Sequence, residues 1–109
     1  MALPIRQVVE ELMDLLGLKT VAMIGGVGET RAVVQWTRGR LPQRPHVLRF
    51  ALQVASMIID AKDADVARAW FHGSNPYLGD RVPATVLRDE SLGEVQAEIM
   101  AAARAFAGR

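Results

Sequence analysis

Residues 70–89, WFHGSNPYLGDRVPATVLRD, decide how the second half of the chain folds. An apolar helical run ends at Trp70-Phe71. The sequence Gly73-Ser74-Asn75-Pro76 cannot extend this run, because proline disfavours a helical residue before it and glycine suits a left-handed cap. Gly79-Asp80 favours a second turn, and Pro83 suits the first turn of a short new helix. The stretch therefore predicts a helix corner rather than a solvated linker.

Helical periodicity accounts for most of the remaining chain, and no period-2 alternation of useful length occurs. The fold class is therefore predicted to be all-α. The expected helices span residues 5–16, 19–24, 30–38, 46–61, 63–71, 83–87 and a final segment that begins after Ser91. Ser91 and Glu94 have the spacing of a capping box. Helix 46–61 is apolar around most of its circumference, which predicts either a central position or a dimer seam.

The composition indicates a small folded protein. With 109 residues, half of them hydrophobic, the chain suits one compact domain or two small lobes that share a core. We expect an N-terminal helix-turn-helix lobe over residues 1–59 and a second helical lobe over residues 60–109. The chain has no cysteine, no run of about 20 apolar residues and no signal-peptide pattern. A cytoplasmic protein without membrane contact is therefore expected.

Charge is unevenly distributed along the chain, although the net charge is only +1. Residues 28–50 carry five arginines against one glutamate, whereas residues 60–109 carry six basic and eight acidic side chains. A basic middle and a mildly acidic end suggest two surfaces with different partners.

The expected helices around residues 19–27 and 30–38 have the form of a helix-turn-helix. Val33 and Trp36 anchor one face of the second helix, so the opposite face is expected to point outward and enter the major groove of operator DNA. The predicted DNA contacts are Thr30, Arg31, Val34, Gln35, Arg38, Arg40 and Arg44. The alternative is a solvated arginine-bearing face, because the glycines of residues 25–28 weaken the motif and Glu29 would repel phosphate.

Catalytic chemistry finds little support in the sequence. There are two histidines, His46 and His72, and no nucleophile motif accompanies Ser74 or Ser91. Too few metal-ligand side chains cluster to suggest a metal site, and residues 25–28 lack the spacing of a phosphate-binding loop. We therefore expect no enzyme activity, no metal and no cofactor.

A family resemblance is carried by the spacing of Trp70, then Asn75-Pro76-x-Leu78, then Pro83-Ala84-x-x-Leu87-Arg88-Asp89. This pattern resembles the C-terminal domain of the MbcA/ParS/Xre antitoxins, the partners of RES-domain toxins. Residues 36–39, Trp-Thr-Arg-Gly, also resemble the end of the recognition helix in Xre-type repressors. The resemblance covers about residues 15–40 and 65–109. It implies an antitoxin that neutralises a RES-domain toxin acting on NAD⁺, blocks its active site and represses its own operon.

The resemblance also implies which residues bind the toxin. They are Asn75, Tyr77, Arg81, Arg88, Asp89, Arg104, Phe106 and Arg109. A protruding C-terminal tail is expected to plug the dinucleotide pocket of the toxin. A homodimer is expected, because a symmetric operator favours paired reading helices. The alternative function is a stand-alone helix-turn-helix transcriptional regulator without a toxin partner.

Overall fold

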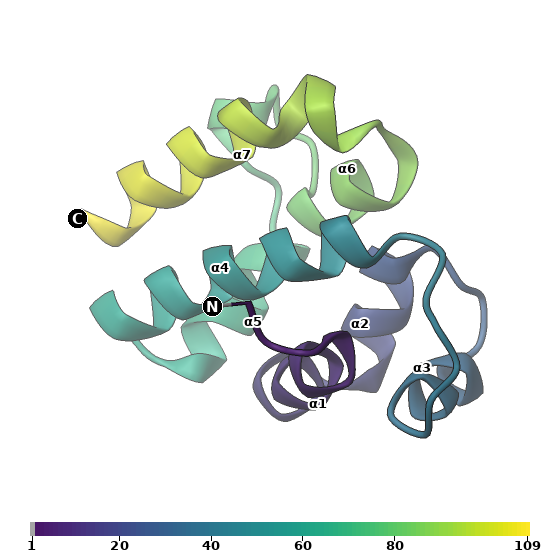
Figure 1. Cartoon of the computed structure of the whole chain (residues 1–109). Coiled ribbons are helices and arrows are strands. Elements are labelled where there is room, and N and C mark those ends of the chain that lie inside the picture. Colours follow the sequence, from purple (N-terminus) through teal and green to yellow (C-terminus); the bar gives the residue numbers. More distant parts are fainter. Residues whose placement is uncertain (1) are drawn as a thin grey trace.

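Helix α4 (Pro45–Ala61) runs through the middle of the computed structural model, which describes residues 2–109 (Figure 1). The other elements are α1 (Ile5–Leu16), α2 (Leu18–Gly25), α3 (Thr30–Trp36), α5 (Ala64–His72), the 3-10 helix η1 (Pro76–Leu78), α6 (Pro83–Asp89) and α7 (Leu92–Ala107). These residues form no strand, which confirms the predicted all-α fold. Over the same range, none of the helices has the length and apolar character that a bilayer crossing requires.

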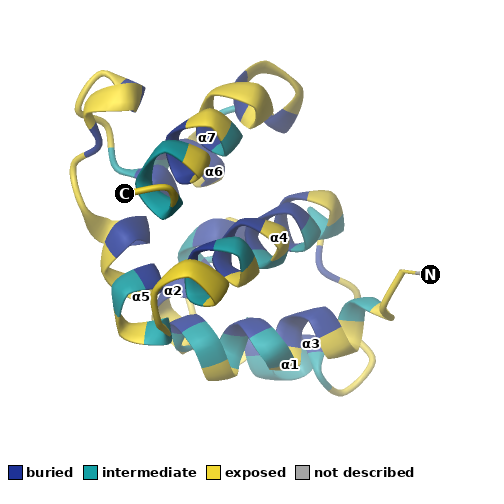
Figure 2. Cartoon of the chain, turned by 90° about the vertical axis from the view of Figure 1, so that its left-hand side faces the viewer, coloured by how far each residue is buried: buried dark blue, intermediate teal, exposed yellow. Residues whose placement is uncertain are grey.

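Helix α4 is central because its apolar circumference is covered from several directions. Helices α1, α2, α5 and α7 all pack against it, and Figure 2 shows much of its length as buried. The exposed positions before its last residue are all polar: His46, Gln53, Ser56 and Asp60. The sequence predicted that this helix is either central or at a dimer seam, and its central place is therefore confirmed. The homodimer stays a prediction.

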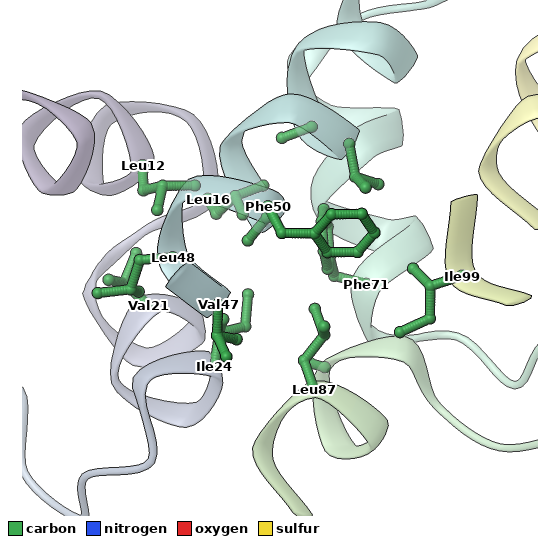
Figure 3. Packing of buried hydrophobic residues seen from close by; sticks show 14 of the residues in the cluster. Leu12, Leu16, Val21, Ile24, Val47, Leu48, Phe50, Phe71, Leu87 and Ile99 are labelled. Atoms are coloured by element: carbon green, nitrogen blue, oxygen red, sulfur yellow. The ribbon is translucent and has the colours of Figure 1, made fainter. Parts of the chain in front are cut away.

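A single cluster of buried side chains joins all seven helices. In Figure 3, Phe50 of α4 and Phe71 of α5 lie next to one another, with Leu87 of α6 and Ile99 of α7 close by. The Trp70 ring meets Phe71 edge-on, with 5.2 Å between the ring centroids. Residues 1–59 and 60–109 thus contribute to one core, and the boundary predicted between them falls in the last turn of α4. The division into two lobes stays a prediction.

The corner between α5 and α6 is organised by the buried Asn75. Its side-chain oxygen accepts a hydrogen bond from the backbone amide of Tyr77 at 3.0 Å. Its backbone amide donates to the Arg81 carbonyl at 3.1 Å. Gly79 and Asp80 complete the turn in the left-handed region, with φ of 64° and 65°. The left-handed cap predicted at Gly73 is wrong, because this residue is extended. The chain turns back at the η1 segment instead.

Two helix ends differ from the sequence prediction. Ser91 is the N-cap of α7, but its side chain forms no capping bond. In a capping box, the backbone amide of Glu94 would donate to the Ser91 hydroxyl. Here that amide donates to the backbone carbonyl of Ser91 instead. Helix α3 ends at Trp36, two residues earlier than expected, and the chain continues through a turn to Gly39.

The close packing of α2 against α3 depends on a glycine. A Cβ atom at Gly25 would lie 2.6 Å from Cη2 and 2.9 Å from Cζ3 of Trp36. Trp36 is itself buried, so its ring has no free space into which it could move. The bare backbone of Gly25 therefore lets the aromatic anchor of α3 lie directly on the end of α2.

We expect Gly25→Ala to lower the free energy of unfolding by about 1–3 kcal/mol, because overpacking forces a rigid ring to move. Gly28→Ala is the matched control, since a Cβ there meets nothing within 4 Å. It should change stability by less than about 0.5 kcal/mol. Urea unfolding of the two variants measures both effects, and equal losses would contradict the close contact.

Candidate functional site

The outward face of α3 and the turn after it carry most of the side chains predicted to contact DNA. Arg31 and Arg38 are exposed, and within residues 2–109 neither forms an ion pair or a hydrogen bond through its side chain. Thr30, Val34 and Gln35 are partly buried at the edges of this face. Gln35 accepts a hydrogen bond from Nη1 of Arg40 at 2.6 Å. Val33 and Trp36 are buried on the opposite face, which confirms the predicted anchoring of the helix.

Helices α2 and α3 have the order and connection of a helix-turn-helix. Residues 26–29 join them, and Gly26 takes a left-handed conformation with φ of 78° at the end of α2. Glu29 is exposed in this turn as the N-cap of α3. The geometry thus presents two free guanidinium groups outward and one carboxylate beside them.

Arg44 has a structural role that the sequence analysis missed. Its Nη1 donates to the carbonyls of Leu87 and Arg88, both at 2.9 Å, and its Nη2 donates to the Glu90 carbonyl at 3.1 Å. Its side-chain stem passes the turn before α3, where a Cβ at Gly26 would lie 3.8 Å from Cδ of Arg44. The last carbonyls of a helix lack partners within the helix, and a guanidinium fork satisfies them. This arrangement argues against the predicted contact of Arg44 with DNA.

We expect Arg44→Ala to lower the free energy of unfolding by about 1–3 kcal/mol, since it removes charge-assisted bonds to partly buried carbonyls. Arg44→Lys should recover only part of the loss, because an ammonium group lacks the planar fork. Arg40→Ala is the control, because the Arg40 side chain is exposed and its one hydrogen bond within residues 2–109 goes to the side chain of Gln35. Similar stability of all three variants and the parent in urea would disprove this role.

A cleft of about 840 Å³ lies between the α2–α3 turn and the end of α6. It brings together residues that the sequence analysis assigned to different partners, because Thr30 and Arg31 line it together with Arg88. Its walls are Lys19, Ala22, Met23, Gly26, Val27, Gly28, Glu29, Thr30, Arg31 and Arg88. Three basic side chains against one acidic side chain give the cleft a positive surplus.

Arg88 and Asp89 form an exposed ion pair at the edge of this cleft. The distances are 2.7 Å from Nε to Oδ1 and 3.0 Å from Nη2 to Oδ2. The hydrogen bond with Arg88 lowers the pKa of Asp89 below its ordinary value, and the same bond raises the pKa of Arg88. Because both groups face solvent, the pair contributes little to stability and is open to exchange with another ligand.

Arg88→Gln should raise the pKa of Asp89 toward its ordinary value, as measured by NMR titration of the side-chain carboxyl. The sign follows from the lowered pKa in the folded state. Any stabilisation from the pair is present above the pKa of the unfolded chain and is lost as the pH falls through the folded value. An unchanged pKa in the variant would mean that the pair does not form in solution.

Four of the predicted toxin-binding residues surround a second pocket, of about 340 Å³. Asn75 and Tyr77 come from the corner, and Phe106 and Arg109 come from the end of α7. Tyr77 is 56% exposed, while Asn75 is buried and holds the loop that carries it. The remaining lining residues are Val66, Ala69, Trp70, Gly73, Ser74, Pro76 and Ala102. The result is an aromatic pocket with a cationic side chain at one end.

Trp70 lines this pocket in addition to the predicted residues, and Lys62 contacts two of the residues that line it. The indole Nε1 of Trp70 is buried and has no hydrogen-bond partner among the described residues, which is unusual for a buried donor. The Nζ of Lys62 lies 5.9 Å from the centroid of the Phe106 ring and donates to the Arg109 carbonyl at 2.7 Å. The sequence placed Trp70 at the end of an apolar helical run and in the family pattern, but it was not among the residues predicted to bind the toxin.

The other predicted toxin-binding residues lie apart from the pocket. Arg81 pairs with Glu90 and, at 3.5 Å, with Glu98. Arg104 is exposed on α7 and does not line the pocket. The predicted protruding tail is wrong, because α7 continues to Ala107 and buries Ala102 and Ala103 against the core. The apolar stripe of residues 92–106 continues the helix to the end and holds it in place.

Neither His46 nor His72 lines either cleft. His72 forms a 2.7 Å hydrogen bond between its Nε2 and the hydroxyl of the buried Thr20. Among residues 2–109, no three histidine or acidic side chains lie close enough together to hold a metal ion.

No protein-family model matches the chain, and the curated proteins and solved structures contain no significant match to it.

Proposed function

We propose that the chain is an antitoxin that neutralises a RES-domain toxin through the aromatic pocket and binds operator DNA through α3. The observation that carries the toxin half is the convergence of Asn75, Tyr77, Phe106 and Arg109 on one pocket. The resemblance selected these four residues, which lie up to 34 positions apart in the sequence, from Asn75 to Arg109. Their meeting at one place supports a shared role.

The chemistry of the pocket suits a protein partner. Exposed tyrosine and partly buried phenylalanine give large apolar contact at a small entropic cost, which is typical of interface anchors. The partner is a RES-domain toxin that acts on NAD⁺, and the bound antitoxin blocks access to the dinucleotide site. Blocking follows from bulk at the entrance to that site, since α7 offers no free tail to insert.

The DNA half of the proposal is supported by α2 and α3. Arg31 stands outward on a helix that Val33 and Trp36 hold from behind, and Arg38 is exposed in the turn that follows this helix. Arginine is the side chain that most often recognises guanine in the major groove. A homodimer would place two such helices on a symmetric operator and repress the operon from which the antitoxin is made.

A stand-alone transcriptional regulator is the second candidate, favoured because α2 and α3 do not need the aromatic pocket to contact DNA. The coding sequence next to that of this chain separates the two. We expect a RES-domain protein there, and we expect it to copurify with this chain and to stop growth when expressed alone. Copurification and growth rescue both failing would leave the regulator as the better proposal.

Tyr77→Ala should weaken toxin binding by at least about tenfold, because it removes an exposed aromatic anchor at the pocket. Leu41→Ala is the matched control: its side chain is 76% exposed and does not line the pocket. Isothermal titration with the purified toxin measures both affinities, and circular dichroism checks folding. Equal affinity of the two variants would place the toxin contact elsewhere.

A further inference from the structure

We propose that the cleft between the α2–α3 turn and α6 holds the sugar-phosphate backbone of the bound DNA, with Arg88 as a phosphate contact. The inference rests on the proposed DNA-binding function and extends that surface from α3 to α6. The family resemblance assigns Arg88 to the toxin, and the position of the side chain suggests this second role.

The first support is the arrangement of the elements. Helix α2 packs against α3 on one side and against α6 on the other, as Figure 1 shows. Arg31 belongs both to the outward face of α3 and to the wall of the cleft. A duplex read by α3 would therefore continue past Arg31 to the end of α6. An extended polyanion fits this continuous path better than an isolated small anion does.

The second support is the charge of the cleft. Lys19, Arg31 and Arg88 line it against Glu29 alone. Ala22, Met23 and Val27 also line it, and these apolar side chains offer the cations no competing hydrogen-bond acceptors. Phosphate contacts of this kind position a protein on DNA without reading its sequence.

The third support is the way in which Arg88 is held. Arg44 donates to the carbonyls of Leu87, Arg88 and Glu90, so the backbone that carries Arg88 is tied to the connection that follows α3. Arg44 is thus a positioning residue for the contact and does not itself reach the DNA. Asp89 occupies the guanidinium of Arg88 through an exposed pair, which a phosphate oxygen can replace.

The test compares binding of a duplex containing the chain's own promoter, by fluorescence anisotropy between 50 and 200 mM salt. Arg88→Ala should weaken binding about fivefold to tenfold at 0.1 M salt and reduce the log–log salt slope by about 0.9, the value for one phosphate. Asp89→Asn should strengthen binding, because it frees the guanidinium. Arg68→Ala and Asp65→Asn on α5 are controls of equal charge change outside the cleft, expected to stay within about twofold of the parent.

A scan of neutral methylphosphonate linkages along the duplex locates the contact. At one linkage the difference between the parent and Arg88→Ala should disappear, because the partner charge has been removed. If no linkage abolishes the difference, the role of Arg88 is overturned. It is also overturned if Arg88→Ala and Arg68→Ala have equal effects while Arg31→Ala weakens binding. Either result would leave the proposed DNA binding by α3 standing. A parent protein without salt-dependent DNA binding would overturn the DNA half of the proposed function as well.

Discussion

The need to cover the apolar circumference of α4 governs the rest of the structure. A helix with seven fully buried side chains between Val47 and Ile58 must have neighbours on several sides. Helices from both halves of the chain supply them, so the elements that carry the two candidate surfaces share one core. The surfaces are therefore fixed relative to one another by close packing, and a core of low compressibility transmits strain between them.

Sequence patterns located the helices well because their information is local. Periodic apolar residues fixed the faces of α1, α4 and α7, and proline fixed the start of α6. The patterns failed where a partner lies far away in the sequence. Arg44 was assigned to DNA as one of several arginines near α3. Nothing in the neighbouring sequence predicts that its guanidinium donates to carbonyls 43 to 46 residues later. The depth of Asn75 could not be foreseen for the same reason.

The candidate sites were likewise predictable only where the information is local in the sequence. Resemblance selected Asn75, Tyr77, Phe106 and Arg109, and the packing of α7 beside the corner explains why they meet. Resemblance could not reveal that Arg31 and Arg88 line one cleft, since this depends on how α2 is inserted between α3 and α6. Arg31 and Arg88, which were expected on different surfaces, line one cleft, so a protein partner that engaged Arg88 would approach the same space as a ligand of α3.

The bonds made by Arg44 have a consequence for how such a protein could diverge. All three acceptors are main-chain oxygens, which every amino acid supplies. Substitution at position 88 or 90 can therefore alter which molecule is recognised without releasing the segment from its anchor. Under the proposed function, specificity and architecture are thus encoded by different residues, and new partners could be acquired while the scaffold stays intact.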